Sequence, residues 1–395
     1  MPIVVFVLAA AVFAQGTSEF MVSGLLELIA ADVGVSIGAA GLLTSLFAGG
    51  MVVGAPVMAM VTGRLSVRYS VTAFLGLFCL AHVVGAVTDE FAVLLVTRVV
   101  AAVANAGFLA VVLAALPGLV GSAIVGRATS VVVSGVTVAC IAGVPAGALL
   151  GQVWGWRSAF WAVAILSAAA LAPVWMMLRH VVHQDDSLEQ PVRREWLVLG
   201  QRPVLIPVVA GILVNAATFA GFTYLGTITN GIAGGDRWVP LVLALFGVGS
   251  FLGVMVTGRF GDGHQPRIIR TGTITLTGVW MLAAVLSHTL AGVSVMSIVL
   301  GAFAFGVGSA LIGTIVRTAA PVAPRIAGAL ATTALNIGAV LGPVAAGPLV
   351  DRNGHPTTAL WCGAVFTAVA AGVALLGHQR RDSRPVERAR ADRSI

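Results

Sequence analysis

The sequence predicts an all-α membrane protein of twelve transmembrane helices, arranged as two related halves of six. Three observations predict this fold: an apolar composition, apolar stretches of similar length, and likeness between the two halves of the chain. Of the 395 residues, 58% are hydrophobic and 9% are charged, and the mean hydropathy is +1.02. Soluble proteins carry about a quarter charged residues. The composition therefore excludes a chain that is kept in water.

Apolar stretches of about 20 residues, each long enough as a helix to cross about 30 Å of hydrocarbon, recur along the whole length. Short polar breaks separate them. In order, we expect spans at residues 3–29, 36–62, 70–88, 91–116, 129–152, 158–178, 203–230, 238–257, 268–287, 291–316, 326–350 and 357–377.

The first apolar stretch is interpreted as a retained span rather than a secretory signal peptide. No basic residues precede residues 3–14, and the apolar run continues past Glu19 to Ile29. The three cysteines, Cys79, Cys140 and Cys362, lie inside apolar stretches without pairing or metal-ligand spacing. We expect buried small side chains there, with no disulfide and no metal site.

The basic residues set the orientation. All 22 are arginine, and the net charge is +7. On the expected topology 18 of them share one side, and only Arg157, Arg237 and Arg352 lie on the other, with Arg98 inside a span. The positive-inside rule then places both termini in the cytoplasm of a bacterial cell with an inner membrane. The membrane explains the charge better than a nucleic-acid partner does.

Residues 179–202 form the longest polar break and divide the chain into two six-helix bundles, 1–178 and 203–378. They are a cytoplasmic linker, and residues 379–395 a basic cytoplasmic tail that we expect to be disordered. Internal likeness supports duplication, because Val61-Thr-Gly-Arg-Leu65 and Val256-Thr-Gly-Arg-Phe260 occur 195 residues apart. Two six-helix halves are typical of transporters built from repeats.

Three segments carry a resemblance to a known family. The fifth span reads GVPAGALLGQVWGWRSAF over residues 143–160, and it looks like the antiporter motif of major facilitator drug efflux proteins. Residues 16–26 of the first span and 98–108 of the fourth resemble the chloramphenicol-resistance and sugar-efflux branch of that superfamily. The resemblance implies the major facilitator fold with a central cavity, alternating access, proton-driven export of an amphipathic compound, and a monomer.

The resemblance also implies a cytoplasmic gate, made here from Arg64, Arg68, Arg259 and Asp262. In the family an acid usually precedes the arginine at position 64, whereas this chain has Gly63. We therefore expect Asp262, in the matching loop of the second half, to pair with nearby arginines.

Glu19 is the strongest chemical signal, because it alone among 15 acidic residues lies deep in a span. Placing a charged residue there costs about 2.5–3.5 kcal/mol on insertion scales, so such residues usually face a polar cavity and carry function. We expect Glu19 to exchange a proton. The alternative is a neutral carboxyl group that bonds two helices together.

Two further residues are assigned to proton coupling. Glu27 lies eight residues after Glu19, on nearly the same helix face but near the outer surface; it passes protons inward or, alternatively, simply meets water. Arg98 lies at a depth between the two acids, and we expect it beside one of them. The alternative for Arg98 is a purely structural ion pair.

Gly143, Gly147, Gly151 and Gly155 recur every four residues and form a stripe on the fifth span that permits close helix contact. Pro145 removes one backbone hydrogen bond, which suits a hinge between the bundles. The alternative is tight packing without motion. Packing is the interpretation for the glycine pairs at 50/54 and 249/253.

Polar and aromatic residues in apolar spans are candidates for a substrate cavity: Gln15, Asn105, Asn215, Phe219, Phe222, Tyr224 and Asn336. Their mixture suits an amphipathic ligand. For each of the polar ones, a hydrogen bond between helices is the alternative. His82, in the third span, is interpreted as a packing histidine.

No loop is long enough for a catalytic domain, and no phosphate-binding motif appears, so we expect neither an enzyme nor ATP as the driver. The partners are a small molecule, protons and the lipid bilayer, with no cofactor beyond the proton gradient. Proton-coupled export of a chloramphenicol-like drug is the first hypothesis. The alternatives are a sugar or metabolite exporter and a non-transporting sensor or scaffold.

Overall fold

The computed structural model describes residues 1–62, 66–121, 124–178, 200–260, 265–323 and 326–391, with the backbone alone at 55–62, 260 and 376–391. The helices of the first half are α1 (Ile3–Val33), α2 (Ile37–Ala40), α3 (Leu42–Thr62), α4 (Val67–Val87), α5 (Phe91–Val120), α6 (Val125–Val138), the π-helical turn η2 (Ala139–Gly143), α7 (Val144–Trp154) and α8 (Trp156–Met177). Those of the second half are α9 (Arg202–Thr223), α10 (Leu225–Asn230), the 3-10 turn η4 (Asp236–Trp238), α11 (Val239–Phe260), α12 (Gln265–Leu286), α13 (Leu290–Ala319), α14 (Ala327–Asn353) and α15 (Thr358–Ala391).

Twelve helical stretches of the described chain are long and apolar enough to cross a membrane. They match the twelve predicted spans, which confirms the predicted all-α membrane fold. The match follows from a strict constraint: a chain in hydrocarbon must satisfy its backbone hydrogen bonds within each segment, so every span is a helix.

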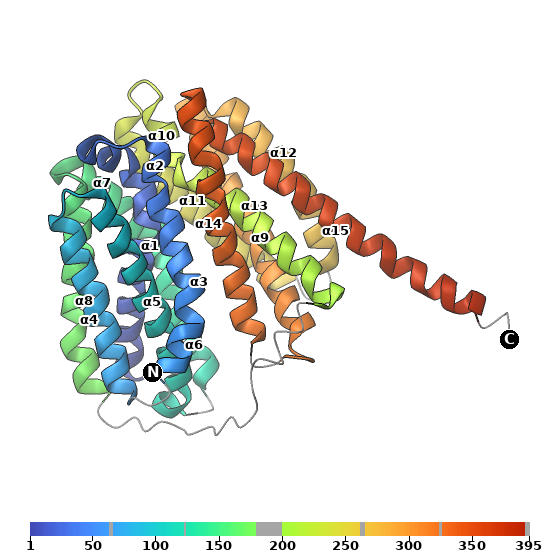
Figure 1. Ribbon diagram of the computed structural model, residues 1–395, viewed down its shortest axis with the longest axis horizontal. Helices are drawn as coiled ribbons and strands as arrows, with labels where there is room; N and C mark the ends of the chain where they lie inside the picture. Colours follow the sequence, from blue (N-terminus) through green and yellow to red (C-terminus); the bar gives the residue numbers. More distant parts are fainter. Residues whose placement is uncertain (63–65, 122–123, 179–199, 261–264, 324–325, 392–395) are drawn as a thin grey trace.

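The helices form two bundles that lie side by side (Figure 1), with α1–α8 in one and α9–α15 in the other. Contacts between the bundles join α14 to α2 and α3, α11 to η2 and α7, and α1 to α9 and α10. The ribbons of the two bundles meet at the end that carries α2 and α10 and separate toward the opposite end (Figure 1).

The glycine pairs confirm the packing interpretation and show the same arrangement in each half. A side chain at Gly50 or Gly54 of α3 would meet the backbone of α5, and one at Gly249 or Gly253 of α11 would meet the backbone of α13. Since small residues allow helix backbones to approach in a membrane, both contacts depend on glycine.

The fifth span contains a local change of helix type. The α-helix α6 widens into the π turn η2, and α7 follows with Pro145 in its first turn. Proline lacks an N–H and its ring collides with the carbonyl four residues earlier in an α-helix. A π turn directly before Pro145 accommodates both, and such turns are frequent at functional sites.

Other expectations meet the structure as follows. The backbone of α15 stays helical as far as Ala391, beyond the apolar stretch that ends at Leu375, although a disordered tail was expected from residue 379. Arginine, glutamate and alanine favour helix, which explains the extension. Arg64, Asp262 and residues 179–199 of the linker lie outside the described residues.

Candidate functional site

Helix α1 borders the second half along one face. The residues of this face follow helical spacing (i, i+1, i+4, i+5, i+8), which places them in one stripe. They are Glu19, Phe20, Ser23, Gly24 and Glu27.

Contacts along this stripe reach the second half directly. The ring of Phe20 lies 5.9 Å from that of Phe219. Close to the outer end, a side chain at Gly226 would meet the Ser23 backbone, so α1 and α10 approach closely there. Because Glu19 belongs to the same stripe, its side chain lies on the side of α1 that borders the junction of the two halves.

Glu19 is partly exposed, although it lies deep in a span. It is within electrostatic range of Arg98 on α5 and of Cys140 in η2. Among the described residues it forms no direct ion pair with Arg98. A partly exposed carboxyl group with a cation nearby has the accessibility and the charge environment that reversible proton binding requires.

Arg98 is buried, with 1% of its surface exposed. It donates from Nη1 to Ser18 Oγ and from Nη2 to the Ser18 carbonyl, both at 2.8 Å. Its guanidinium carbon lies 4.3 Å from the ring centroid of Phe47, a cation–π contact that offsets part of the cost of burial. The cation therefore bonds to the residue that precedes Glu19, not to a carboxylate.

The second half contributes an aromatic cluster to the junction. Phe219 and Phe222 are each 6% exposed and contact Phe20 of the first half, the latter edge-on at 6.0 Å. Phe246 continues the cluster 4.8 Å from Phe222, and Phe305 lies 6.0 Å beyond it. These rings form a buried apolar cluster that reaches α1 at Phe20, the neighbour of Glu19 in the sequence.

The predicted polar cavity residues separate into two groups. Asn215 donates to the Leu335 carbonyl at 2.6 Å and so bonds α9 to α14, while Asn336 donates to the Thr332 carbonyl of its own helix. Tyr224 is fully buried and donates weakly to the Pro343 carbonyl at 3.4 Å. For these three, the contacts made are those of helix packing.

Gln15 and Asn105 are different. Gln15 is 1% exposed, and neither atom of its amide has a hydrogen-bond partner. It lies one helical turn before Glu19 on α1, hence near the same face. Asn105 is buried on α5, two turns after Arg98. Both lie beside the Glu19 and Arg98 region on the cytoplasmic side.

The glycine stripe of the antiporter-like segment packs against a second face of α1. Side chains at Gly143, Gly147 and Gly151 would meet Thr17, Met21 and Leu25 respectively. Both sets are spaced by four residues, so the two helices lie along each other within the first half. The stripe thus serves tight packing. Gly155 ends the helix with a φ of 79°, a conformation that favours glycine.

The π turn η2 before Pro145, where the hinge was predicted, contacts a different helix from the one that the glycine stripe contacts. A side chain at Gly247 of α11 would meet the Cys140 carbonyl in η2, so the π turn itself lies against the second half. The fifth span therefore contacts the other bundle through this irregular turn as well as through α7, where Gln152 donates to the Asp236 carbonyl.

Hydrogen bonds join the halves at the outer end. Asp351 of α14 accepts from Ser36 Oγ at 2.6 Å and from the Gly38 N–H at 2.8 Å. Asn230 donates to Glu27 Oε2, which gives that carboxylate a partner in the second half. We call these contacts the outer closure.

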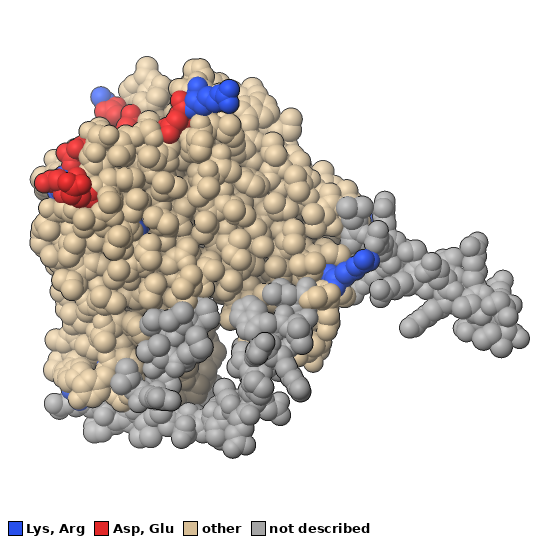
Figure 2. Space-filling view, viewed as in Figure 1, with Lys and Arg blue, Asp and Glu red and all other residues tan. Residues whose placement is uncertain are grey.

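The same end carries the acidic side chains. Of those that the structure describes, all but Glu19 and Glu27 are exposed, and the ones visible in Figure 2 lie at the end that carries α2 and α10.

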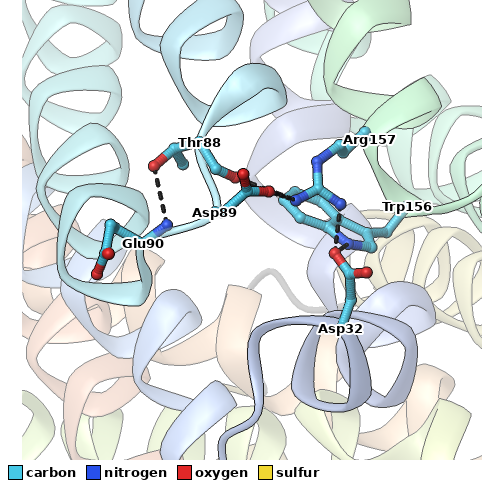
Figure 3. Close-up of polar contacts among 6 residues, drawn as sticks. All are labelled: Asp32, Thr88, Asp89, Glu90, Trp156 and Arg157. Atoms are coloured by element: carbon cyan, nitrogen blue, oxygen red, sulfur yellow. Dashed lines mark hydrogen bonds and ion pairs between the residues drawn. The ribbon is translucent and has the colours of Figure 1, made fainter.

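Figure 3 shows how Arg157, in the antiporter-like segment, joins α8 to α1 and to the loop between α4 and α5. Its guanidinium forms ion pairs with Asp32 and Asp89, while Asp32 also accepts from Trp156 at 2.9 Å. This network fixes the start of α8 to α1.

Of the residues assigned to the cytoplasmic gate, two lie in the described chain. Arg68 stacks on Trp175, with its guanidinium carbon 3.5 Å from the ring centroid. Arg259 is exposed at the end of α11. The gate stays a prediction, because Arg64 and Asp262 lie outside the described residues.

Three residues of the site were not assigned a role from the sequence, Ser18, Phe20 and Asp351, and His82 was interpreted as a packing histidine. Phe20 carries a usable signal, because it follows Glu19 directly and lies two helical turns before Glu27 on the same face. Ser18 carries none, since one serine in an apolar helix has no distinguishing pattern. Asp351 finds its partners more than 300 residues away.

Comparison with known proteins gives consistent matches. Residues 8–343 match the family described as Major Facilitator Superfamily. The chain is 43% identical over 380 residues to a chloramphenicol resistance protein of Streptomyces lividans, covering 95% of this chain and 96% of that protein. It is 28% identical to the inner membrane transport protein YdhP of Escherichia coli K12, covering 93% of each.

Solved structures agree on the fold. The nucleoside transporter NupG superposes with a TM-score of 0.78 at 13% identity, covering 95% of this chain and 98% of that one. A bacterial homologue of the human lysosomal transporter Spinster, in an inward-facing and unoccupied conformation, gives 0.74 at 15% identity, with 95% of each chain covered. The chain is therefore a multi-pass membrane transporter that belongs to the major facilitator superfamily.

Proposed function

We propose that this secondary transporter exports small amphipathic compounds, among them chloramphenicol-like drugs, in exchange for protons by alternating access. The observation that carries the proposal is Glu19: a lone acid deep in the membrane, partly exposed, on the face of α1 that meets the second half. Arg98 lies within electrostatic range of the carboxyl group without a direct ion pair among the described residues, so the group is free to bind and release a proton, as a proton carrier must.

The substrate class follows from the aromatic cluster beside Glu19. Phe20, Phe219 and Phe222 offer ring faces and edges that suit an aromatic or apolar group, while Glu19 and the unpartnered amide of Gln15 offer polar contacts. The similarity to a chloramphenicol resistance protein supports an aromatic drug as the substrate.

The conformational cycle is supported by the outer closure. In this state Asp351 and Glu27 bond across the halves at the end with acidic side chains, which the positive-inside rule places outside the cell. The cytoplasmic ends of the bundles separate (Figure 1). We infer an inward-facing transporter in a bacterial inner membrane, working as a monomer with both termini in the cytoplasm.

A drug-sensitive bacterial host tests the proposal. The wild-type chain, Glu19→Gln and the matched control Glu90→Gln are expressed at equal levels, and growth is measured across chloramphenicol and a panel of other toxic compounds. Glu90 is an exposed carboxylate at the outer end, so the control makes the same chemical change away from the site. We expect protection from the wild type and the control and loss of protection with Glu19→Gln.

Other outcomes identify the alternatives. Protection that survives Glu19→Gln would exclude proton coupling through this residue. Absence of protection against every compound would favour a sugar or metabolite exporter, or a sensor or scaffold without transport. A radiolabelled sugar panel in vesicles then separates those two.

A further inference from the structure

His82 of α4 is a buried histidine with a defined hydrogen-bond arrangement. It is 1% exposed and lies between the rings of Phe78 and Phe160, at centroid distances of 4.3 and 5.8 Å. Its Nδ1 is 2.8 Å from the Phe78 carbonyl oxygen. A carbonyl can only accept, so Nδ1 carries the hydrogen, and Nε2 of the neutral ring is left as an acceptor.

Ser18 lies between this acceptor and Arg98. Its Oγ is 2.6 Å from His82 Nε2 and 2.8 Å from Arg98 Nη1. A guanidinium only donates, so Ser18 Oγ accepts from Arg98, and its own hydroxyl hydrogen is donated to His82 Nε2. The three side chains form one directed chain, from Arg98 through Ser18 to His82.

A charged His82 does not fit this chain. With hydrogens on both ring nitrogens, Nε2 would donate to Ser18, and the serine hydroxyl hydrogen would lose its acceptor. A second cation would also lie one hydroxyl group away from Arg98. The arrangement therefore requires a neutral ring, which acts as an acceptor for the Ser18 hydroxyl.

The hydrogen-bond chain from Arg98 to His82 fixes where the Arg98 charge lies relative to Glu19. Ser18 and Glu19 are adjacent on α1, so their side chains point about 100° apart around the helix. A guanidinium held by both the hydroxyl and the carbonyl of Ser18 is thus near Glu19 but directed away from its carboxyl group.

We propose that Ser18 and His82 are positioning residues that hold Arg98 off the Glu19 carboxyl group, which keeps that group free to exchange its proton. This inference rests on the proposed function of Glu19. A direct ion pair in apolar surroundings would favour the charged carboxylate too strongly for a proton to be taken up near neutral pH. The groups that face Glu19 are Arg98 from α5 and Cys140 from η2, with His82 of α4 acting through Ser18.

A pair of substitutions at His82 separates positioning from packing. In His82→Asn the amide nitrogen can still donate to the Phe78 carbonyl, but nothing reaches Ser18. In His82→Gln the longer side chain can bring an amide oxygen to the place of Nε2. Ser18→Ala removes the central hydroxyl. Each variant is reconstituted in proteoliposomes, and chloramphenicol transport driven by a pH gradient is measured against pH.

We expect the pH of half-maximal transport to fall by about one unit in Ser18→Ala and His82→Asn, because the released Arg98 pairs with Glu19 and resists its protonation. His82→Gln keeps the wild-type profile. Unchanged profiles in Ser18→Ala and His82→Asn overturn the proposal. Equal shifts in the two His82 variants also overturn it, since packing alone would then explain the effect.

A measurement on the wild-type protein does not depend on transport and needs a variant only to assign one signal. Nitrogen-15 NMR of histidine-labelled protein, with His82→Asn used to assign the signal, reports which ring nitrogen carries hydrogen. We expect hydrogen on Nδ1 and none on Nε2. Hydrogen on Nε2 would overturn the hydrogen-bond chain and the proposal that rests on it. If Glu19→Gln still transports with the pH gradient, the proposed function fails while the NMR result stands. If Glu19→Gln is inactive and the NMR signal is wrong, the positioning inference fails alone.

Discussion

The two halves of the molecule share their helix packing and differ in their chemistry. In each half a glycine pair brings the second and fourth spans together, Gly50 with Gly54 and Gly249 with Gly253. The first half then carries a buried arginine, a buried histidine and a deep acid, whereas the second half presents a row of phenylalanine rings at the junction.

The difference indicates a division of labour on a repeated scaffold. Charged groups on one bundle respond to protons, and rings on the other offer a surface to an apolar part of the substrate. Since Glu19 and Phe20 are neighbours on α1, the proton site and the aromatic cluster meet at one place. Changes in the first half should therefore affect coupling, and changes in the second half should affect substrate binding.

Among the substitutions that test this division between the halves, Arg98→Met is expected to have the largest effect on transport. Arg98 makes two charge-assisted hydrogen bonds to Ser18, each worth about 1.5–3 kcal/mol, and is the cation near Glu19, so we expect proton-driven transport to fall by about 100-fold or more. Transport of chloramphenicol into proteoliposomes under a fixed pH gradient measures it. Arg352→Met, an exposed arginine at the outer end, is the control. Near-normal transport by Arg98→Met would remove the buried cation from the coupling site.

A smaller effect is expected from Phe222→Ala, which sharpens the assignment of the second half. Aromatic contacts contribute about 0.5–1.5 kcal/mol beyond their burial, so we expect chloramphenicol to bind roughly tenfold more weakly. The pH dependence of transport should stay unchanged. Equilibrium binding of radiolabelled drug measures the affinity, with Phe303→Ala, a 39% exposed ring on α13, as the control. A shifted pH profile with normal affinity would reverse the proposed division.

Much of the fold follows from the sequence because the bilayer restricts what each segment can be. Twelve apolar stretches gave twelve helices, and the glycine spacing at 50/54 and 249/253 predicted close packing correctly. The hinge in the antiporter-like segment stays a prediction; its glycines at 143, 147 and 151 lie against α1 of the same bundle. The sequence could not show which helix the stripe meets, because a stripe of small residues can pack closely against any neighbouring helix.

The candidate site was less predictable than the fold, since it depends on contacts between residues far apart in the sequence that only helix packing brings together. Glu19 and Arg98 stand out because charges are rare in spans. The hydrogen-bond chain from Arg98 through Ser18 to His82 could not be foreseen, because Ser18 and His82 lie 80 and 16 residues from Arg98 and each resembles an ordinary packing residue. Tyr224 and Asn215 were candidates for a cavity, yet their polar atoms bond to neighbouring helices.

The smallest effect is expected at the outer closure, where hydrogen bonds join the two halves. Asp351→Asn keeps one oxygen that can accept a hydrogen bond but loses the charge that strengthens both contacts, to Ser36 and to the Gly38 N–H. Exposed charged contacts contribute about 0.2–1 kcal/mol, so the balance of states should shift toward the outward-open one by about two- to fivefold.

Distances between spin labels on exposed Ala31 and Asn353, measured by electron resonance with the native cysteines replaced by alanine, report this balance. We expect a larger share of long distances in Asp351→Asn, and a share close to that of the unsubstituted protein in the nearby control Asn353→Ser when its label is moved to Arg352. Because the substitution touches neither Glu19 nor the aromatic cluster, the pH profile and the drug affinity should both be retained. A changed pH profile would mean that closing the outer end and protonating Glu19 are directly linked, and the two halves would then share the coupling role assigned here to the first.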